Sequence, residues 1–587
     1  MQYQIQFGSL NSNSATAKPG TNFRIAVLGD FSGNGNAGRV NIGDELASRK
    51  PLRVSHENLD ALLTRLNVSL NLPAGASGAT ISVPIRSLDD FHPDQLYNNV
   101  PIFEKLVSLR QKLQDPTSFP KAAAAVRSLM SDPSVGFTPM RKSTSSTVPR
   151  GRIESFADLI QRDVKTPDAP ELKTLLRDVV GSHVVAQMEG QAELISAVDH
   201  SLSDLMRRLL HHPDFQAMES LWRSLDFILH RMEIDSGLDI VLYDLNAAEF
   251  AADLAAQENL EETGLFKWLV EGPAQDAAQG ALSLLLCNFV FEVIPPHAEL
   301  LARMAKIAAA AGAPFVAAVH CDALKKQDPD QIHPLVKQSW HALKQVPETA
   351  YLGLTTPRFM LRWPYGKKTE PIESFAFEEF TPQSGLSGML WGNSAFLAGL
   401  VIGQTYLNDG LSSMKLGSVL TVGDMPYYFY TDSDGDQVAL PCTERLVNVR
   451  TAQFATSQGF IPALAIQGRP EVRLGGLLSL TGAPLAGPWA PSAARSGQGA
   501  PQIADAQSTF GQPSQVDSTN EPSQATDELD ALLGSLESDA APAQSSDDQP
   551  DDLDNLLASL DSEDASKSAD QTASDFDADL AAMLADL

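Results

Sequence analysis

The chain is poor in basic residues, in cysteine and in long apolar runs, and each shortage excludes a class of protein. Among its 587 residues, 43 Lys and Arg stand against 73 Asp and Glu, which gives a formal charge of −30. Because nucleic-acid binding usually needs a positive surface, this balance argues against a nucleic-acid partner. The 3 cysteines are too few and too scattered for a disulfide framework or a four-ligand zinc site, and a reducing compartment fits them.

Membrane and export signals are also missing. No stretch approaches the roughly 18 apolar residues of a transmembrane helix, because the longest candidates, 282–294 and 396–403, are short or broken by polar residues. The N-terminal segment Met1–Phe7 has no basic region followed by an apolar one, so it does not resemble a signal peptide. We therefore expect a soluble, cytoplasmic protein with no direct membrane insertion.

The negative charge is concentrated at one end. Residues 491–587 hold 21 acidic and two basic side chains, a net charge of −19, which leaves −11 for the first 490 residues. From about residue 486 the chain is rich in Ala, Pro, Ser, Gln, Gly and Asp, which is typical of a disordered tail.

Three leucine-rich islands interrupt this acidic tail. In the first, the leucines stand at i, i+3, i+4 and i+7, which is one stripe of a helix, and the second repeats the pattern 24 positions later. We expect short amphipathic helices that dock into grooves of an unidentified partner; the alternative is a solubilising acidic sequence with chance leucines. The expected docking residues are Leu529, Leu532, Leu533, Leu536, Leu553, Leu556, Leu557, Leu560, Phe576, Leu580 and Leu584.

Strand-like and helix-like patterns alternate before the tail, which predicts an α/β protein with mixed sheets. Tyr3, Ile5 and Phe7 alternate with glutamine, so this terminal strand could add to a neighbouring sheet or be a frayed end. The predicted division is an N-terminal strand and linker (1–20), a first domain (21–135), a linker (136–152), a second domain (153–485) and the disordered tail (486–587).

Periodicity also places individual elements. Strands are expected at 23–28, 52–54, 79–85, 238–242, 282–293, 314–319 and 359–363, and helices at 59–66, 249–258 and 297–311. A further helix is expected after Trp391-Gly-Asn-Ser394, with Asn393 as its cap.

Motifs with catalytic or metal-binding potential are weak. Gly33-Asn-Gly-Asn-Ala-Gly38 follows a predicted strand, as a dinucleotide site would, but the next residues show no helical pattern that could hold a pyrophosphate. We interpret it as a Gly/Asn loop and keep a nucleotide-binding enzyme as a distant alternative. The segment 432–436 resembles a turn more than a calcium loop, and His211, His297 and His320 resemble structural histidines. We expect no catalysis, no cofactor and no metal.

Two sets of motifs resemble a known pair of proteins. Phe23-Arg-Ile-Ala-Val-Leu-Gly-Asp-Phe-Ser-Gly33, Arg49–Val54 and Arg86–Asp94 resemble the small sheath subunit of type VI secretion systems (TssB, VipA or ImpB). His211–Leu225, Pro357–Gly366, Phe375–Glu379, Leu390–Asn393, Thr443–Arg445 and Gln458–Pro462 are similar to the large sheath subunit (TssC, VipB or ImpC). The resemblance covers about 23–480, so the two subunits look fused through the linker 136–152.

The resemblance implies a structural component of a contractile apparatus. In that family the two subunits pair, exchange strands and stack around an inner tube above a baseplate, and an AAA+ unfoldase disassembles the contracted sheath. The implied partners are therefore copies of this chain or other sheath subunits, inner tube and baseplate proteins, and an unfoldase. Its large-subunit similarity stops near 480, which keeps open a non-polymerising accessory or capping paralogue that recruits partners through its tail. The expected structural or assembly residues are Tyr3, Ile5, Phe7, Phe215, Trp222, Trp363, Trp391 and Asn393.

Overall fold

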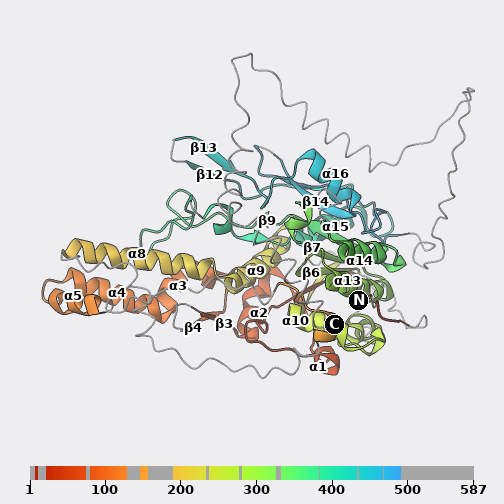
Figure 1. Cartoon of the computed structure of the whole chain (residues 1–587), viewed down its shortest axis with the longest axis horizontal. Coiled ribbons are helices and arrows are strands. Elements are labelled where there is room, and N and C mark those ends of the chain that lie inside the picture. The colour runs from red at the N-terminus through yellow and green to blue at the C-terminus, as the bar shows by residue number, and fades with distance from the viewer. Residues whose placement is uncertain are drawn as a thin grey trace, which may run out of the picture.

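The computed structural model describes residues 5, 7–10, 22–73, 80–128, 146–156, 190–232, 234, 237–275, 280–325, 332–382, 384–431, 435–466 and 468–490. Tyr3, most of the linker and all three leucine-rich islands lie outside these ranges. The described part is an α/β structure, as expected, and Figure 1 shows one broad α/β body from which a bundle of helices extends to one side.

A nine-stranded mixed sheet forms the centre of the α/β body. Its order is β11-β15-β14-β8-β7-β6-β1-β5-β2. Strands β14, β8, β7, β6, β1 and β5 run parallel, whereas β2, β15 and β11 are antiparallel to their neighbours. The strands are β1 (Phe23–Gly29), β2 (Leu52–Val54), β5 (Leu238–Asp244), β6 (Leu284–Phe291), β7 (Phe315–Val319), β8 (Leu352–Thr356), β11 (Thr421–Val422), β14 (Phe460–Ala465) and β15 (Val472–Leu474).

Strand β1 comes from the beginning of the chain but lies inside a sheet built mostly by its second half. Ile25 of β1 pairs with Ile240 of β5 on one side and with Leu284 of β6 on the other. Parallel strands covered on both faces are near-continuous apolar runs, and the sequence of β1 has this character. The regions predicted as a first and a second domain therefore share one sheet, while the exact boundaries between them stay a prediction.

Both faces of β1 are buried in separate cores. Ile25 and Val27 belong to the core packed under α9 (Pro213–Arg231) and α15 (Ala395–Asp409). Ala26 and Leu28 belong to the opposite core, which the other helices of the body cover. These helices are α10 (Ala247–Ala256), α13 (Pro295–Ala311) and α14 (Pro334–Lys344).

The helical bundle beside the sheet also combines the two regions. Helices α4 and α8 lie side by side in Figure 1 and contact each other, although the first precedes the linker and the second follows it. Arg110 of α4 donates to Asp199 of α8 at 2.5 Å, which links their polar faces. The bundle comprises α3 (Pro93–Asn99), α4 (Pro101–Gln114), α5 (Phe119–Ser128) and α8 (Gln191–Leu210).

The remaining elements are short. Within the described residues the helices are α1 (Gly43–Ala47), α2 (Leu59–Leu66), α11 (Gly264–Phe266), the π-turn η5 (Lys267–Glu271), α12 (Gly272–Gln275) and α16 (Val449–Ser457). The 3₁₀ turns are η1 (His56–Asn58), η2 (Leu88–Phe91), η3 (Ile153–Phe156), η4 (Leu260–Glu262), η6 (Cys321–Leu324), η8 (Pro347–Tyr351) and η9 (Gly385–Gly388). Three two-stranded ribbons are β3 (Val68–Pro73) with β4 (Thr80–Ile85), β9 (Phe359–Met360) with β10 (Trp391–Gly392), and β12 (Tyr428–Thr431) with β13 (Gln437–Leu440).

Most local predictions are confirmed within one or two residues. Gly312 ends α13 in the left-handed conformation (φ +68°), and β12 and β13 flank the turn expected at 432–436. The predicted strand 359–363 is wrong beyond Met360, where β9 ends. Strand β3, which pairs with β4 across Val68 and Ile85, was not expected.

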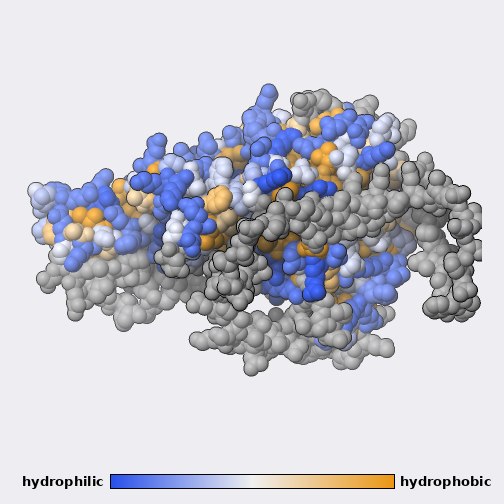
Figure 2. Space-filling view, turned by 90° about the horizontal axis from the view of Figure 1, so that it is seen from above, coloured by the Kyte–Doolittle hydropathy of each residue, from blue (hydrophilic) through white to orange (hydrophobic). Residues whose placement is uncertain are grey.

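The surface is that of a polar protein. Figure 2 shows hydrophilic residues over most of the visible face, with hydrophobic residues in small groups between them. Among the helices of the described ranges, none combines the length and apolar character needed to cross a bilayer.

Candidate functional site

Helix α9 forms the apolar part of the contact between the two regions. The Phe215 ring lies 5.6 Å from Phe91, edge to face, and the Trp222 ring lies 5.3 Å from Phe31 in the same kind of arrangement. Both α9 side chains are fully buried, as are Phe31 and Phe91. The predicted core positions Phe215 and Trp222 are therefore confirmed as buried, and sequence alone did not reveal that their partners come from the first region.

Buried carboxylates of the second region bind the backbone of the first. Glu249 accepts from the backbone N–H of Asn41 at 2.9 Å and from both terminal nitrogens of Arg49. Asp253 accepts from the N–H of Gly43 at 2.7 Å and also from Gly264 at 2.9 Å. Each carboxylate joins segments more than 200 positions apart, so these bonds fix the loop after β1 against α10.

The backbones of the two regions approach closely at Gly43 and Gly264. A Cβ on Gly264 would collide with the carbonyl oxygen of Gly43, and Gly43 itself has φ +57°. An alanine at position 264 would thus push the two backbones apart and lengthen the hydrogen bonds that Asp253 accepts from Gly43 and Gly264.

The Gly33–Gly38 loop is hydrogen-bonded to the protein's own Asp30 side chain. Residues 34–38 form turns, 39–42 continue without helix, and the next helix, α1, begins at Gly43. The N–H of Gly35 donates to Asp30 at 2.9 Å, so an amide that would serve a phosphate is already bonded. Burial and the nearby carboxylate of Asp244 raise the pKa of Asp30 to about 8, despite the opposing bond from Gly35. This geometry supports the loop interpretation over a dinucleotide site.

Three separate sequence motifs meet in a buried ion-pair network. Arg362 donates to Glu219 of α9 at 2.8 Å and to Glu379 at 2.7 Å, and its guanidinium lies 4.2 Å from the ring centroid of Tyr365. Arg223, one turn after Glu219, donates to the same carboxylate at 2.7 Å and to the Tyr365 hydroxyl at 3.0 Å. The side chains of Arg362, Glu219 and Glu379 are 7%, 0% and 1% exposed.

The network keeps Glu379 charged. Burial alone would raise the pKa of Glu379, but the charge of Arg362 and hydrogen bonds from His211 and Arg362 outweigh it and hold the pKa at about 2. The Tyr365 N–H also donates to Glu379 at 2.8 Å. Sequence reasoning missed this network, because the two carboxylate partners of Arg362 lie 143 and 17 positions away from it and only the fold brings them together.

Arg362 and Trp363 lie beyond the end of β9, in the part of the predicted strand that the structure does not form. Trp363 is 46% exposed and its indole N–H donates to the carbonyl of Tyr427, and its expected assembly role stays a prediction. Arg362 is the buried residue because its two carboxylate partners lie inside the body. The local chain leaves the extended conformation after Met360 to make this possible.

Trp391 and Asn393 precede α15, as expected, but the predicted cap is off by one residue. Ser394 is the N-cap, and Asn393 before it accepts from the N–H of Ala395, the first residue of α15, at 2.9 Å. Trp391 is 8% exposed and pairs with Met360 across the β9–β10 ribbon. Their expected assembly role stays a prediction.

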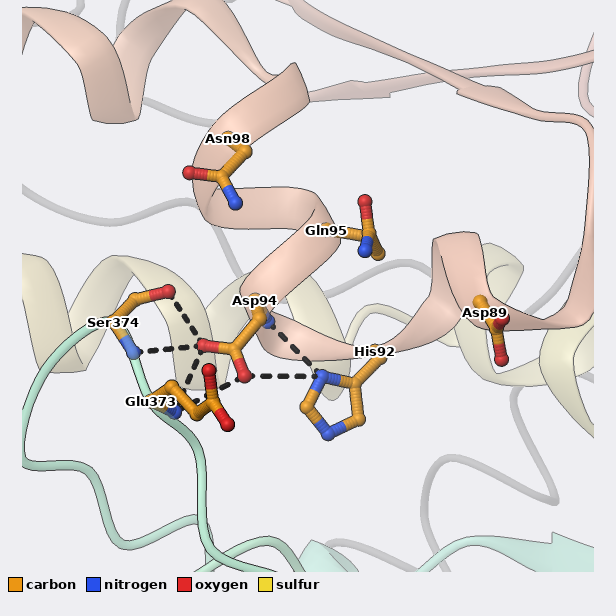
Figure 3. Close-up of a pocket in the computed structure, with 7 residues that line it drawn as sticks. All are labelled: Asp89, His92, Asp94, Gln95, Asn98, Glu373 and Ser374. Atoms are coloured by element: carbon orange, nitrogen blue, oxygen red, sulfur yellow. Dashed lines mark hydrogen bonds and ion pairs between the residues drawn. The ribbon is translucent and has the colours of Figure 1, made fainter.

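A polar depression of about 360 Å³ marks the contact between η2, α3 and the segment before Phe375. Figure 3 shows Asp94 at its centre, bonded to the backbone N–H groups of Glu373 and Ser374, to the Ser374 hydroxyl and, as an ion pair, to His92. Burial opposes the charge, but the bonds from Ser374 and Glu373 lower the pKa of Asp94. Since Asp94 is already satisfied, we interpret the depression as another junction between the two regions.

The N-terminal segment contacts the same body. Phe7 packs at the edge of the core beneath α10 and α13, and the Ser9 N–H donates to the carbonyl of Glu258 at 2.8 Å. Lys306 of α13 donates to the carbonyl of Gly8 at 2.7 Å. Ile5 is half-buried, and the strand-addition role of Tyr3, Ile5 and Phe7 stays a prediction.

Comparisons with known families agree with this two-part construction. Residues 4–132 match the family described as type VI secretion system, VipA, and residues 192–480 match VipB (EvpB), tail sheath N-terminal domain. The type VI secretion system sheath protein TssC1 of Pseudomonas aeruginosa is 31% identical over 287 residues, which is 46% of this chain and 57% of that protein.

The chain belongs to the type VI secretion sheath family and combines a VipA-like and a VipB-like region in one polypeptide. The break between the two matches, at 133–191, includes the predicted linker. The chain spans little more than half the length of the curated relative.

Proposed function

We propose that this protein is a structural sheath subunit of a type VI secretion-like contractile apparatus, in which one chain supplies both members of the small–large pair. The observation that carries the proposal is the position of β1, inside the sheet between β5 and β6. A strand paired on both sides and buried on both faces is an integral part of the body. On this proposal the fused chain behaves as one assembly unit, and its role is structural rather than catalytic, in keeping with its similarity to sheath proteins.

Fusion of the VipA-like and VipB-like regions in one chain changes how the small–large pair forms. Pairing within one chain replaces a bimolecular encounter by an intramolecular one, at an effective concentration set by the linker, and it fixes the ratio of the two regions at one to one. The burial of Phe215 and Trp222 against Phe91 and Phe31 supports a permanent contact rather than a transient one.

Assembly with neighbouring copies would use free strand edges. The outer strands of the nine-stranded sheet are β2 and β11, and an outer strand offers unpaired backbone groups to an incoming strand. We propose that the N-terminal residues Tyr3, Ile5 and Phe7 of one copy, or a strand of another sheath subunit, add at such an edge. Inner tube and baseplate proteins and an AAA+ unfoldase are the further partners, and the cytoplasm is the proposed location.

The partial coverage of the curated relative supports a second candidate function, that of an accessory sheath protein. Similarity to the curated relative spans 57% of that protein, and beyond residue 480 this chain continues into the acidic, leucine-containing segment. Under this alternative the protein caps or accompanies a sheath without polymerising and recruits a partner through Leu529 and the equivalent leucines.

Electron microscopy of the purified full chain, alone and mixed with inner tube and baseplate proteins, separates the two. Regular tubes support the sheath subunit. Discrete particles bound only at tube or baseplate ends support the accessory role, and particles that join neither structure contradict both. A variant with Leu529, Leu532, Leu533 and Leu536 changed to serine tests the tail, because it should lose partner recovery while leaving the body folded.

A further inference from the structure

A pair of histidines lies at one end of the contact between the two regions. His56 begins the turn η1 after β2, and His230 lies in the last turn of α9, 174 positions later. Their Nε2 atoms face each other at 2.6 Å, and the rings are nearly perpendicular, with centroids 4.2 Å apart. Two imidazoles in this arrangement share one proton or hold one cation between them.

The second nitrogen of His230 is held by a carboxylate. Asp226 precedes His230 by one helical turn, and its Oδ1 lies 3.0 Å from Nδ1 of His230. This is the arrangement of a metal-binding histidine, in which a carboxylate fixes the ring and leaves the other nitrogen free to coordinate. The ligand atoms that His56, Asp226 and His230 can offer all lie within 4.8 Å of one another.

We propose that His56 and His230 bind a divalent transition-metal ion of the zinc class through their Nε2 atoms, with Asp226 orienting His230. Zinc–nitrogen bonds of about 2.0–2.1 Å in a tetrahedral site hold two ligand nitrogens roughly 3.3 Å apart. The rings need to separate by less than about 1 Å from their present position. Such a movement is open to them because His56 is exposed and the His230 side chain is 49% exposed. Water completes the coordination from the solvent side.

The metal would connect the two regions of the chain. One ligand belongs to the VipA-like region and the other to the VipB-like region, so the ion bridges β2–α2 and the C-terminal end of α9. Binding to the folded chain alone would raise its stability by mass action. This brace lies outside the buried Arg362 network and outside the polar depression at Asp94.

Isothermal titration of zinc chloride into the chelator-treated full chain tests the site. We expect one zinc ion to bind per chain. His56→Gln and His230→Gln should each weaken the affinity for zinc by at least tenfold. Asp226→Asn, which loses only the orienting group, should weaken binding by about 10-fold. His320→Gln changes another group of nearby His, Cys and Asp side chains and serves as the matched control, which should leave this site unaltered.

Thermal melting of each variant in the presence of chelator checks that it remains folded. Titration of magnesium chloride in place of zinc chloride checks that imidazole rather than carboxylate groups are the ligands, because magnesium prefers carboxylates. The proposal is overturned if the His56→Gln/His230→Gln double variant binds zinc as the original chain does, or if the original chain shows no saturable zinc binding. Zinc that raises the melting temperature of the original chain but not of the double variant supports the brace.

Discussion

Replacing Arg362 by methionine should destabilise the protein more than any exposed charge substitution. The change removes the cation shared by Glu219 and Glu379, which are 0% and 1% exposed. Glu219 keeps its ion pair with Arg223, whereas Glu379 loses its guanidinium partner. Removing one partner of a buried ion pair costs about 3–5 kcal/mol, mainly because the remaining charge stays in an apolar surrounding. Because the buried Glu379 is left without its guanidinium partner, we expect a loss within this range.

Urea unfolding followed by tryptophan fluorescence measures this loss as a lower midpoint. Lys325→Met is the matched control, because Lys325 pairs with Asp322 at the surface, where both side chains are more than half exposed, and such a pair contributes about 0–1 kcal/mol. The double variant Arg362→Met/Glu379→Gln should recover part of the loss, since it removes both charges of that ion pair and leaves Arg223 paired with Glu219. An Arg362→Met chain that unfolds within about 1 kcal/mol of the original would refute the assignment of the network as a main stabiliser.

Acid should weaken the same network. The pKa of Glu379 is about 2 in the folded chain and 4.5 as its ordinary value, so its contribution is complete above pH 4.5 and is lost as the pH falls from 4.5 towards 2. The difference corresponds to roughly 3 kcal/mol. In Glu379→Gln the acid-induced drop of the urea midpoint should be smaller; an unchanged drop would show that other carboxylates account for it.

Three further substitutions test other parts of the account. Asp30→Asn keeps the acceptor for Gly35 but cannot ionise. Burial and the carboxylate of Asp244 raise the pKa of Asp30 to about 8, so from pH 4 to 8 the folded chain keeps this group protonated while the unfolded chain ionises it, and the original chain loses stability as the pH rises. The stability of the variant relative to the original chain should therefore grow from pH 4 to 8, and a difference that stays constant would contradict this. Gly264→Ala should lower the melting temperature through the collision with the Gly43 carbonyl, whereas Gly272→Ala, whose added Cβ meets nothing closer than 3.5 Å, should not; equal effects would be evidence against the close approach. Trp222→Ala should cost about 3–5 kcal/mol in urea unfolding through the cavity it leaves, and a loss below about 1 kcal/mol would exclude it from the core.

Local sequence signals predicted the elements well because their causes are local. Gly312 after an apolar helix and the continuous apolar run of β1 each indicate structure within a few residues. The neighbours of β1 were not predictable in this way, since its partners Ile240 and Leu284 lie more than 200 positions away.

The same limit explains why the ion pairs of Arg362 were not predicted. Its carboxylate partners lie 143 and 17 positions away, so no local pattern indicates that the arginine is buried between them. The histidine pair His56–His230 is likewise invisible to a motif search, because its members come from opposite regions of the chain. Resemblance identified the two regions, whereas the contacts that join them come from the structure alone.

The two regions form one body through a shared sheet, and cleavage of the linker between them is the sharpest test of this arrangement. A specific protease site inserted after Lys142 allows the folded full chain to be cut between the regions, followed by size-exclusion chromatography in high salt. The account predicts that the fragments ending and beginning near Lys142 elute together at the position of the uncut chain, and separate only in denaturant. Fragments that elute apart under native conditions would contradict the buried position of β1 between β5 and β6.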